Sequence, residues 1–353
     1  MIGRTNSGGG GGEAHGAIIA GTVECNNLAT VELSLNGEVI RTVKTDEIYA
    51  FGNIQTPGTY TITATEGDKS VEKTATVTSD NIIYKQTVTV DTINLIVIIV
   101  SFSDGTDEQI ANMVQAHYDN IINLSDYWAV GDTRSVSLSA MPATGVGESH
   151  RAQTVQFVIG GFEHDDLTTS INGHSKAAVT LLQKDCLMDA NNASNPVNGS
   201  TNIENGYINS SNSNESGWKS CERRTWCNNV YYKALPSAWK SMVKTVNKKT
   251  SLGSTSHTIE TVQDNIFLAS EIEIFGLITF SAGGEGAQYQ YYKNATANRD
   301  KMPKWSPSRS TSSYFERSPY TQSYNGFCIV TADGGKSFDS PSTPYGIAPC
   351  FCI

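Results

Sequence analysis

Residues 17–91 consist of short runs in which apolar and polar side chains alternate, which is the period of a β-strand with one buried face. The clearest runs are Thr30–Leu35, Glu38–Val43, Thr59–Thr65, Val71–Val77 and Ile82–Val90. Asn36–Gly37 separates the first two runs and is a strong signal for a two-residue hairpin turn. About seven short strands in a segment of this length predict two antiparallel sheets packed face to face.

This strand spacing is typical of an immunoglobulin-like β-sandwich over residues 17–91. The run Pro57–Ile62 also resembles a turn-to-strand signature of bacterial and phage immunoglobulin-like domains. The segment has no Cys…Trp…Cys pattern, so an antibody-type domain is not implied. The preceding residues 1–16 are rich in glycine and predict a flexible N-terminal spacer.

Residues 92–125 predict a connector made of one strand and one helix. Thr92–Phe102 is apolar and rich in β-branched residues, which favours a buried strand. Over Asp107–Leu124 the apolar residues recur at helical spacing, and Thr106 or Asp107 can cap the helix. The residues of the stripe are Ile110, Met113, Val114, His117 and Ile121.

Residues 126–353 predict an α+β domain with long loops. The expected strands are Thr133–Leu138, Val155–Gly160 and Ala177–Leu182, and the expected helices are Lys219–Leu235 and Ser237–Val246. Asp189–Gly217 is almost wholly Asn, Ser, Gly and Thr, and we expect it to stay out of the core. Ile266–Phe275 is apolar without a clear period, so either element type fits it.

Charge and composition narrow the class of protein. The 353-residue chain has a formal net charge of −10, which disfavours binding to nucleic-acid phosphates. Its N-terminus does not resemble a secretory signal, and its most apolar segment, Leu95–Val100, is too short to span a bilayer. A protein made in the cytoplasm without such a signal can still act outside the cell if it leaves inside a virion at lysis. The seven cysteines lack a zinc-binding spacing, so we expect buried thiols and no metal or cofactor.

The sequence holds no GxSxG elbow, phosphate-binding glycine loop, HExxH or dinucleotide fingerprint. His164–Asp166, with His150 or His174, has the side chains to hold a divalent ion or to act as a base. Because this triplet follows a predicted strand, we interpret it as turn residues that satisfy backbone groups. Carboxylates suit glycoside hydrolysis only if the fold brings them together, and those considered are Glu285, Glu316 and Asp333.

Trp305–Tyr345 interleaves aromatic residues with Ser, Gly and Asn, the composition of adaptable binding loops. Tyrosine gives a large contact area at a low entropic cost, and aromatic faces beside hydroxyl and amide groups also suit sugar rings. Polar neighbours predict that Tyr320, Tyr324 and Phe338 are exposed. The aromatic residues expected in the core are Phe315, Phe327 and Phe351.

Several motifs after residue 100 are specific. They are Asp126–Arg134, Gly145–His150, Gly217–Trp218, Arg223–Asn228, Glu273–Gly276, Glu316–Tyr320, Gly326–Cys328 and Gly346–Pro349. Through these motifs residues 101–353 resemble an uncharacterised domain that is widespread in tail proteins of phages and prophages of Gram-positive gut bacteria. The opening Met1–Ser7 with its glycine run is similar to the start of such tail proteins.

This domain in turn resembles the C-type-lectin-like fold of variable phage receptor-binding proteins and formylglycine-generating enzymes. That fold implies that the chain end returns into a sheet and that Glu316–Pro319 and Gly346–Pro349 are framework. It also implies that Tyr320–Asn325 and Lys336–Thr343 face a ligand. Two departures stand out: the calcium-binding Glu-Pro-Asn and Trp-Asn-Asp triplets of sugar-binding lectins are absent, and Tyr314–Phe315 replaces the family's two tryptophans.

Our hypothesis from the sequence is a multidomain, non-enzymatic virion adhesin, in which the sandwich supports a C-type-lectin-like recognition domain. It implies a bacterial surface glycan or protein as ligand, other virion proteins as partners of the N-terminal part, and a homo-oligomer such as a trimer. Two alternatives stay open: a purely structural virion component, and a cell-wall or capsule depolymerase. The candidate ligand-binding residues are Trp305, Tyr320, Gln322, Tyr324, Asn325, Lys336, Phe338, Asp339 and Ser342.

Overall fold

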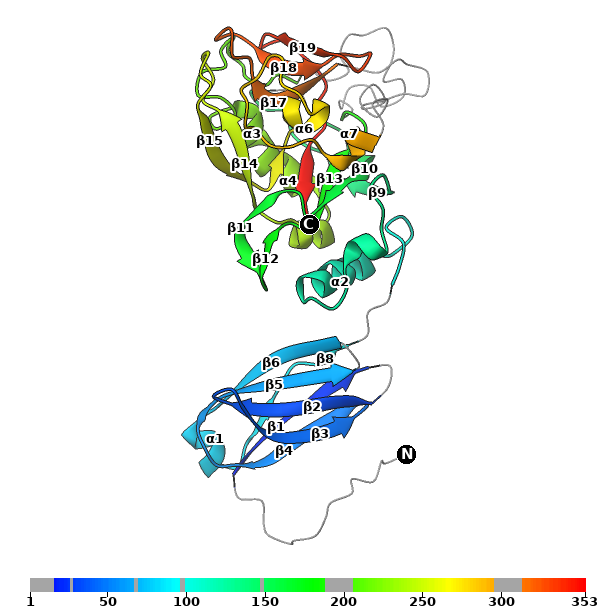
Figure 1. The fold of residues 1–353 in the computed structure, drawn as a ribbon, viewed down its shortest axis with the longest axis vertical. Coiled ribbons are helices and arrows are strands. Elements are labelled where there is room, and N and C mark those ends of the chain that lie inside the picture. The colour runs from blue at the N-terminus through cyan, green and yellow to red at the C-terminus, as the bar shows by residue number, and fades with distance from the viewer. Residues whose placement is uncertain are drawn as a thin grey trace. The chain divides into compact units, whose positions relative to one another are not determined.

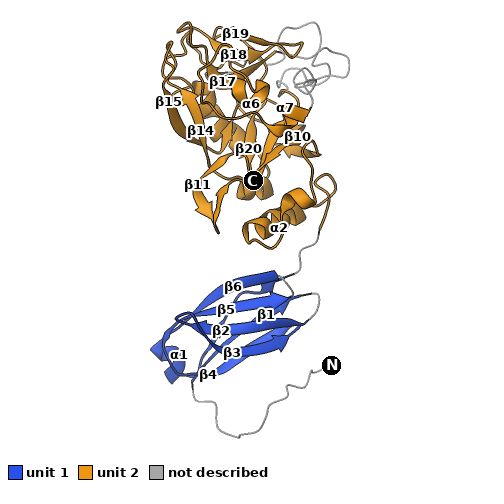
Figure 2. Cartoon of the chain, viewed as in Figure 1, with its two compact units in different colours: residues 1–98 blue, residues 99–353 orange. Residues whose placement is uncertain are grey.

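The computed structural model describes residues 16–25, 28–66, 69–95, 99–146, 149–187, 206–294 and 313–353. The chain divides into two compact units, residues 1–98 and 99–353 (Figure 2). Both units are built mainly from β-sheets, which confirms a multidomain chain with an all-β first unit, whereas the second unit, expected to be α+β, has few helices among its described residues. Among the described helices, none has both the length and the apolar character to cross a membrane.

The first unit is a β-sandwich of two sheets (Figure 1). One sheet has the order β4–β1–β7, with β8 also pairing along β1, and the other has the order β3–β2–β5–β6. The strands are β1 (Ala17–Glu24), β2 (Ala29–Leu35), β3 (Glu38–Thr45), β4 (Ile48–Ile54), β5 (Gly58–Glu66), β6 (Lys69–Val77), β7 (Thr87–Thr89) and β8 (Ile93–Asn94).

Alternating side chains from both sheets fill the core of the sandwich, as the sequence pattern predicts. Asn36 and Gly37 both have positive φ, so the expected hairpin turn between β2 and β3 is confirmed. Gly21 in β1 is needed for packing, because a Cβ atom there would lie 2.5 Å from the hydroxyl of Tyr49.

The predicted strand Ile82–Val90 is wrong in its first part. Ser79–Ile83 forms the short helix α1 because Thr78 and Asn81 make a reciprocal capping box. The Thr78 hydroxyl accepts from the Asn81 amide, and the Asn81 side chain accepts from the Thr78 amide. Only β7 joins a sheet, parallel to β1.

Residues 92–125 do not form a separate connector, since β8 belongs to the first unit and α2 (Asp107–Tyr118) to the second. Of the predicted strand Thr92–Phe102, only Ile93–Asn94 is a strand among the described residues. The carbonyls of Val100 and Phe102 instead accept hydrogen bonds from the side chains of Trp128 and Arg134. Residues 96–98 lie outside the described residues.

The second unit contains three sheets (Figure 1). Their orders are β16–β20–β13–β10–β9, β12–β11–β14–β15 and β17–β18–β19. The strands are β9 (Thr133–Leu138), β10 (Gln153–Phe162), β11 (Asp166–Ile171), β12 (His174–Lys176), β13 (Val179–Gln183), β14 (Val246–Ser251), β15 (Ile259–Asp264), β16 (Ile266–Phe267), β17 (Tyr314–Pro319), β18 (Phe327–Val330), β19 (Lys336–Asp339) and β20 (Cys350–Cys352). The chain end therefore enters a sheet, because β20 lies between β13 and β16.

The predicted helix Lys219–Leu235 forms in continuous parts: α3 (Glu222–Trp226), a π-helical turn (Cys227–Tyr231) and α4 (Tyr232–Ala234). The next helix, α5 (Ser237–Met242), ends before Val246, where β14 begins. The ambiguous segment splits into β16 and α6 (Glu271–Phe275), and α7 (Gln290–Asn294) follows.

All seven cysteines are described and none forms a disulfide, as expected. Six are buried and Cys25 is half-buried. In the second unit, burial raises the pKa of Cys221 and Cys350 to about 12, so these thiols stay protonated and act as small apolar side chains.

The cap of α2 gives a first prediction. The Thr106 hydroxyl accepts from the Gln109 amide while the Gln109 side chain accepts from the Thr106 amide. Thr106→Ala removes this cap and should lower the free energy of unfolding of the second unit by about 1 kcal/mol. Urea denaturation followed by tryptophan fluorescence measures this unit alone, because all five tryptophans follow residue 98.

Thr106→Ser keeps the capping oxygen and is the matched control. It should retain most of the stability. An equal loss in the serine and alanine variants would assign the effect to the threonine methyl group and not to the cap.

Candidate functional site

A buried network of charged groups lies at the centre of the second unit. Lys248 of β14 donates hydrogen bonds to Asp165, which follows β10, and to Glu273 of α6 at 2.7 Å. Arg317 of β17 donates to both oxygens of Glu273. Each of these side chains is at most 5% exposed, so the four charges compensate one another away from water.

Hydrogen bonds satisfy the rest of this network. Asp165 also accepts from the hydroxyl of Thr180 at 2.6 Å and from that of Tyr289 at 3.2 Å. Arg317 donates further to the backbone carbonyls of Leu268 and Glu285. A buried ion pair contributes to a unique structure when its remaining donors and acceptors are met in this way.

The pKa values follow from burial and from these pairings. Burial alone would raise the pKa of Asp165, but the Lys248 ammonium outweighs it and holds that pKa well below its usual range. Likewise, burial is outweighed by Arg317 and Lys248 at Glu273, whose pKa is lowered. At Glu285, burial outweighs the opposing effects of Arg317 and of the hydrogen bonds from Ser318 and Ser251, and it raises the pKa to about 7.

The network fixes the segment that follows α6. Glu271 is fully buried, and its carboxylate accepts hydrogen bonds from the amides of Thr279, Phe280 and Ser281 and from the Ser281 hydroxyl. The amide of Glu271 in turn donates to the Ser318 hydroxyl of β17. One buried carboxylate thus holds the loop 277–281 against β17.

Three aromatic rings meet beside this loop. Tyr320 and Phe338 are stacked, with ring centroids 3.7 Å apart and planes 11° apart, and Phe280 packs at an angle against both. Gly326 allows this approach, because a Cβ atom there would lie 3.0 Å from Cβ of Tyr320. We call Phe280, Tyr320 and Phe338 the aromatic face.

The aromatic face reaches solvent through some of its members. Phe338 is 38% exposed, and Leu277 and Ile278 in the adjoining loop are 69% and 47% exposed. Lys336 lies two residues before Phe338 on β19, so both side chains share one side of the strand. Its ammonium group donates to Thr279 at 2.8 Å and lies 5.1 Å from the ring centroid of Phe275.

A buried asparagine holds the turn next to the aromatic face. The side-chain amide of Asn214 donates to the carbonyls of Tyr320, Ser323 and Gly326. Thr321 donates from its amide and its hydroxyl to the carbonyl of Phe280, which joins the turn to the loop 277–281. The expectation that Asp189–Gly217 stays out of the core is therefore wrong for its described end, where Asn214 is fully buried.

The predicted ligand-binding residues divide into groups. Tyr324, Gln322 and Asn325 are exposed in the turn, and Tyr324 is 62% exposed, as expected. Tyr320 was expected to be exposed but is 9% exposed, because Phe338 covers its ring. The expected core residues Phe315, Phe327 and Phe351 are all buried.

Asp339 and Ser342 have different contacts from the aromatic face. Asp339 accepts from the Tyr345 hydroxyl at 2.6 Å, and Ser342 shares a hydrogen bond with Ser340. Both are half-buried, as is Lys336. Trp305 lies outside the described residues.

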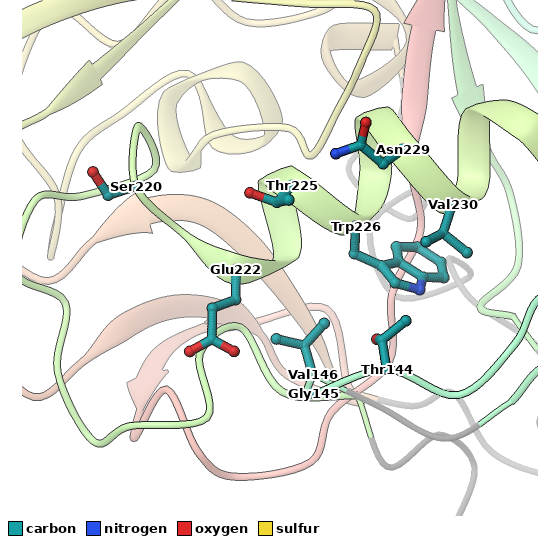
Figure 3. A pocket seen from close by; sticks show the side chains of 9 residues that line it. All are labelled: Thr144, Gly145, Val146, Ser220, Glu222, Thr225, Trp226, Asn229 and Val230. Carbon is teal, nitrogen blue, oxygen red and sulfur yellow. The ribbon is translucent and has the colours of Figure 1, made fainter.

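A second concave feature lies beside α3 (Figure 3). It is a pocket of about 310 Å³ whose lining is mostly apolar, and Figure 3 shows the ring of Trp226 opposite Thr144 and Val146. Glu222 lies at its edge and also borders a polar groove that includes Ser213. The volume of this pocket and its mixture of apolar and polar side chains suit one small chemical moiety of a ligand.

The triplet His164–Asp166 does not converge on one ligand. The His164 ring packs at a tilt against Tyr289, Asp165 points into the buried network, and Asp166 forms a surface ion pair with Lys176. Successive residues project in different directions, which separates their functional groups. A polar pocket of about 330 Å³ reaches the network here, where Lys248 and Arg317 already engage the carboxylates.

The carboxylates considered for hydrolysis also lie in different environments. Glu285 and Glu316 are buried, whereas Asp333 is exposed in the turn before β19. Glu285 accepts from the Ser251 amide at 2.8 Å and from the Ser318 hydroxyl. Burial, with Glu271 and Glu285 nearby, raises the pKa of Glu316 well above its usual range.

Sequence reasoning missed Phe280 and its neighbours Leu277 and Ile278. The run from 276 to 284 is apolar and bounded by glycines, which is a usable signal for an exposed apolar loop. It missed Asn214 and Glu271 as well, because no local pattern marks a polar side chain that binds a distant loop.

Residues 178–353 match the sequence model of a family described as a domain of unknown function (DUF6273). The match begins at β13 and thus omits β9 and β10, which pair with one another and complete the same sheet. The structural unit is therefore larger than the matched region. No curated protein sequence matches the chain.

Glu285 supplies a second prediction, on pH. Its folded-state pKa of about 7 lies above the usual 4.5, so it stabilises the fold at low pH and this contribution is lost as pH rises through 7. The glutamine in Glu285→Gln cannot ionise. Between pH 5 and pH 8, the free energy of unfolding of this variant should therefore fall by about 2 kcal/mol less than that of the wild type. Urea denaturation at both pH values, followed by tryptophan fluorescence, measures this difference.

Glu215→Gln, at an exposed position of the same unit, is the control and should leave the pH dependence unchanged. A Glu285→Gln variant that loses as much stability as the wild type between pH 5 and pH 8 would contradict a neutral buried Glu285.

Proposed function

We propose that this protein is a virion adhesin, a receptor-binding tail protein that recognises a glycan or protein on the surface of a bacterial host without catalysis. One observation carries the proposal. Leu277, Ile278 and Phe338 are exposed, Phe280 contacts Phe338 and is partly covered, and buried polar groups hold the loop that carries Leu277, Ile278 and Phe280.

A preorganised patch of this kind suits recognition for two physical reasons. Its rings and aliphatic groups gain free energy when a ligand removes them from water, and ordering them costs little entropy because they are already fixed. Aromatic residues also dominate the energetic centres of protein interfaces and stack on sugar rings. Exposed Gln322, Tyr324 and Asn325 in the adjoining turn add hydrogen-bonding groups at the rim.

The proposed folds of the two units are an immunoglobulin-like sandwich and a C-type-lectin-like domain. In the first unit the Tyr60 hydroxyl donates to the carbonyl of Thr56, a contact similar to the tyrosine corner of immunoglobulin-like domains. Its strand order, with β1 between β4 and β7, differs from the order of constant-type immunoglobulin domains. In the second unit, the return of β20 into the sheet and the burial of Glu316–Pro319 agree with the framework that the lectin-like resemblance implies.

In this proposal the N-terminal part attaches to other virion proteins and the sandwich spaces the recognition domain. Several copies on one virion, for example a trimer, would raise the overall avidity by about 10²–10⁴ over a weak single site. The two alternatives predict different surfaces. A structural component does not need exposed rings held rigidly. A depolymerase needs carboxylates that converge in a cleft, whereas Glu316 is buried and Asp333 is exposed in the turn before β19.

The third prediction tests adhesion with the full chain and intact cells of a panel of Gram-positive gut bacteria. Wild-type protein should bind one or more strains saturably. Phe338→Ala and Tyr324→Ala should each weaken binding about tenfold or more, since truncating an interface aromatic residue commonly costs over 1 kcal/mol. Flow cytometry with fluorescently labelled, multimerised protein measures the binding.

Tyr84→Ala is the matched control, because Tyr84 is 70% exposed in the first unit, and it should leave binding unchanged. Asn229→Trp fills the pocket beside Trp226. Loss of binding in that variant alone would move the site away from the aromatic face. Failure of the multimerised wild type to bind any strain would favour a structural role, and release of reducing sugar from cell walls would favour the depolymerase.

A further inference from the structure

Two histidines and one glutamate from separate elements meet at another part of the second unit. His117 lies on the last turn of α2, Glu163 directly follows β10, and His174 begins β12. In Figure 1, α2 and β12 lie at the opposite end of this unit from β17–β19. The cluster is therefore independent of the aromatic face.

The functional atoms of the three side chains are close. Nε2 of His117 lies 3.9 Å from Oε1 of Glu163, and Nδ1 of His174 lies 3.6 Å from the same oxygen. One ligand atom from each residue falls within 4.8 Å of the other two. The two imidazole rings also contact each other, with centroids 4.7 Å apart.

His117 is the unusual member of the cluster. It is only 4% exposed, and its ring nitrogens lack a hydrogen bond of good geometry to a described residue, although the Ile122 carbonyl lies near the ring. Nε2 of His174 is also without such a partner among the described residues. A buried nitrogen without a partner costs about 1–3 kcal/mol, so each such group calls for a ligand, a water or an ion that satisfies it.

The fold holds the three elements firmly around this cluster. The side chain of Asn172, in the turn between β11 and β12, donates to Asp119 at 3.0 Å, and Asn120 donates back to the Asn172 carbonyl. Tyr118 accepts from the Ala178 amide, which ties the end of α2 to the start of β13. Glu163 has a φ of +44°, a left-handed conformation that is strained for a side chain of this kind.

An open pocket of about 430 Å³ adjoins the cluster. His117, Glu163 and His174 contribute to its wall, together with oxygen-bearing Asn123 and Asp126. The carboxylate of Glu163 is 56% exposed, so it reaches solvent from the pocket while His117 stays buried behind it. Ions and water therefore have access to the cluster from one side.

We propose that His117, Glu163 and His174 bind a divalent transition-metal ion of the Zn²⁺ class, with at least one coordination position open to the pocket. Two imidazole nitrogens and one carboxylate oxygen form a ligand set that zinc takes in proteins when the fourth position is left for water or a ligand group. Imidazole ligands also favour such ions over Ca²⁺ and Mg²⁺, which prefer oxygen ligands.

A bound zinc ion requires the ligand atoms of the cluster to lie slightly closer together than they do in this structure. Two ligand atoms at about 2.0 Å from a tetrahedral zinc lie about 3.3 Å apart. The observed 3.6 Å and 3.9 Å exceed this by about 0.3 Å and about 0.6 Å, which a rotation of the exposed Glu163 side chain can supply. The imidazole nitrogens of His117 and His174 lie within 4.8 Å of each other. Burial, with His174 alongside, lowers the pKa of His117 against the opposing effects of Glu163 and the Ile122 carbonyl.

The fourth prediction uses the full chain, made without a polyhistidine tag and freed of metal with a chelator. Isothermal titration with Zn²⁺ should show one site per chain. Zinc should also raise the unfolding temperature of the second unit, read by tryptophan fluorescence, because it binds only the folded site. Co²⁺ should give the visible absorption of a low-symmetry site, and Ca²⁺ should give no shift in unfolding temperature.

His174→Ala and Glu163→Gln should each weaken Zn²⁺ binding by about 100-fold or more, since losing even an outer-sphere partner costs 10–100-fold. The controls His257→Ala and Glu215→Gln replace exposed residues of the same types and should bind as the wild type does. Near-ultraviolet circular dichroism verifies that each variant is folded.

Two results overturn the proposal. Absence of saturable zinc binding in the wild type would mean that the imidazoles are satisfied by water and by stacking alone. Binding that persists in both His174→Ala and Glu163→Gln would place the metal elsewhere on the chain. Because cell binding and metal binding are measured separately and at different ends of the unit, failure of one leaves the other intact.

Discussion

The pairing of Lys248 and Arg317 with Asp165 and Glu273 is the interaction on which the second unit depends. These charges are buried, so each would be strongly destabilising without its partners. They can be satisfied only when the end of β10, β14, α6 and β17 occupy one relative arrangement. Alternative packings of the same apolar residues leave a charge unpaired, and the network therefore selects one fold among compact competitors.

The surface features follow from this internal constraint. Arg317 is followed directly by Ser318, Pro319 and Tyr320, so the position of β17 determines where the Tyr320 ring emerges. Glu271, two residues before Glu273 on α6, determines the course of the loop that carries Phe280. Buried polar groups thus determine the shape of an apolar surface, and this arrangement keeps entropy losses on ligand binding small.

The cluster of His117, Glu163 and His174 contrasts with the charge network. In the network every charged group has a partner within the protein, so it has a structural role and no capacity left for a ligand. In the histidine cluster, ring nitrogens are buried without a hydrogen-bond partner among the described residues while a pocket opens beside them. Satisfied polar groups stabilise a fold, whereas unsatisfied ones at a pocket indicate where a ligand belongs.

The sequence alone determined the local structure. Two-residue periodicity located β2, β5 and β9, because one face of each strand is buried and the alternation reports that directly. The turn at Asn36–Gly37 and the cap at Thr106 could also be predicted from the sequence, since each depends on residues within four positions of one another along the chain. Where a competing local signal was overlooked, at the capping box of Thr78 and Asn81, the predicted strand was wrong.

Only the tertiary structure determined which residues come together at the candidate sites. Tyr320 has polar neighbours in the chain, yet Phe338 covers it across the sheet. Asn214 lies in a run of polar residues, yet it is buried because three carbonyls of a distant turn require its amide. His164–Asp166 was a candidate ion-binding group in the sequence, and the fold disperses its side chains. His117 was only one member of an apolar helical stripe, and the fold brings it together with Glu163 and His174. Periodicity states which face of an element is buried, but which distant groups meet there depends on how the elements pack and how their charges pair.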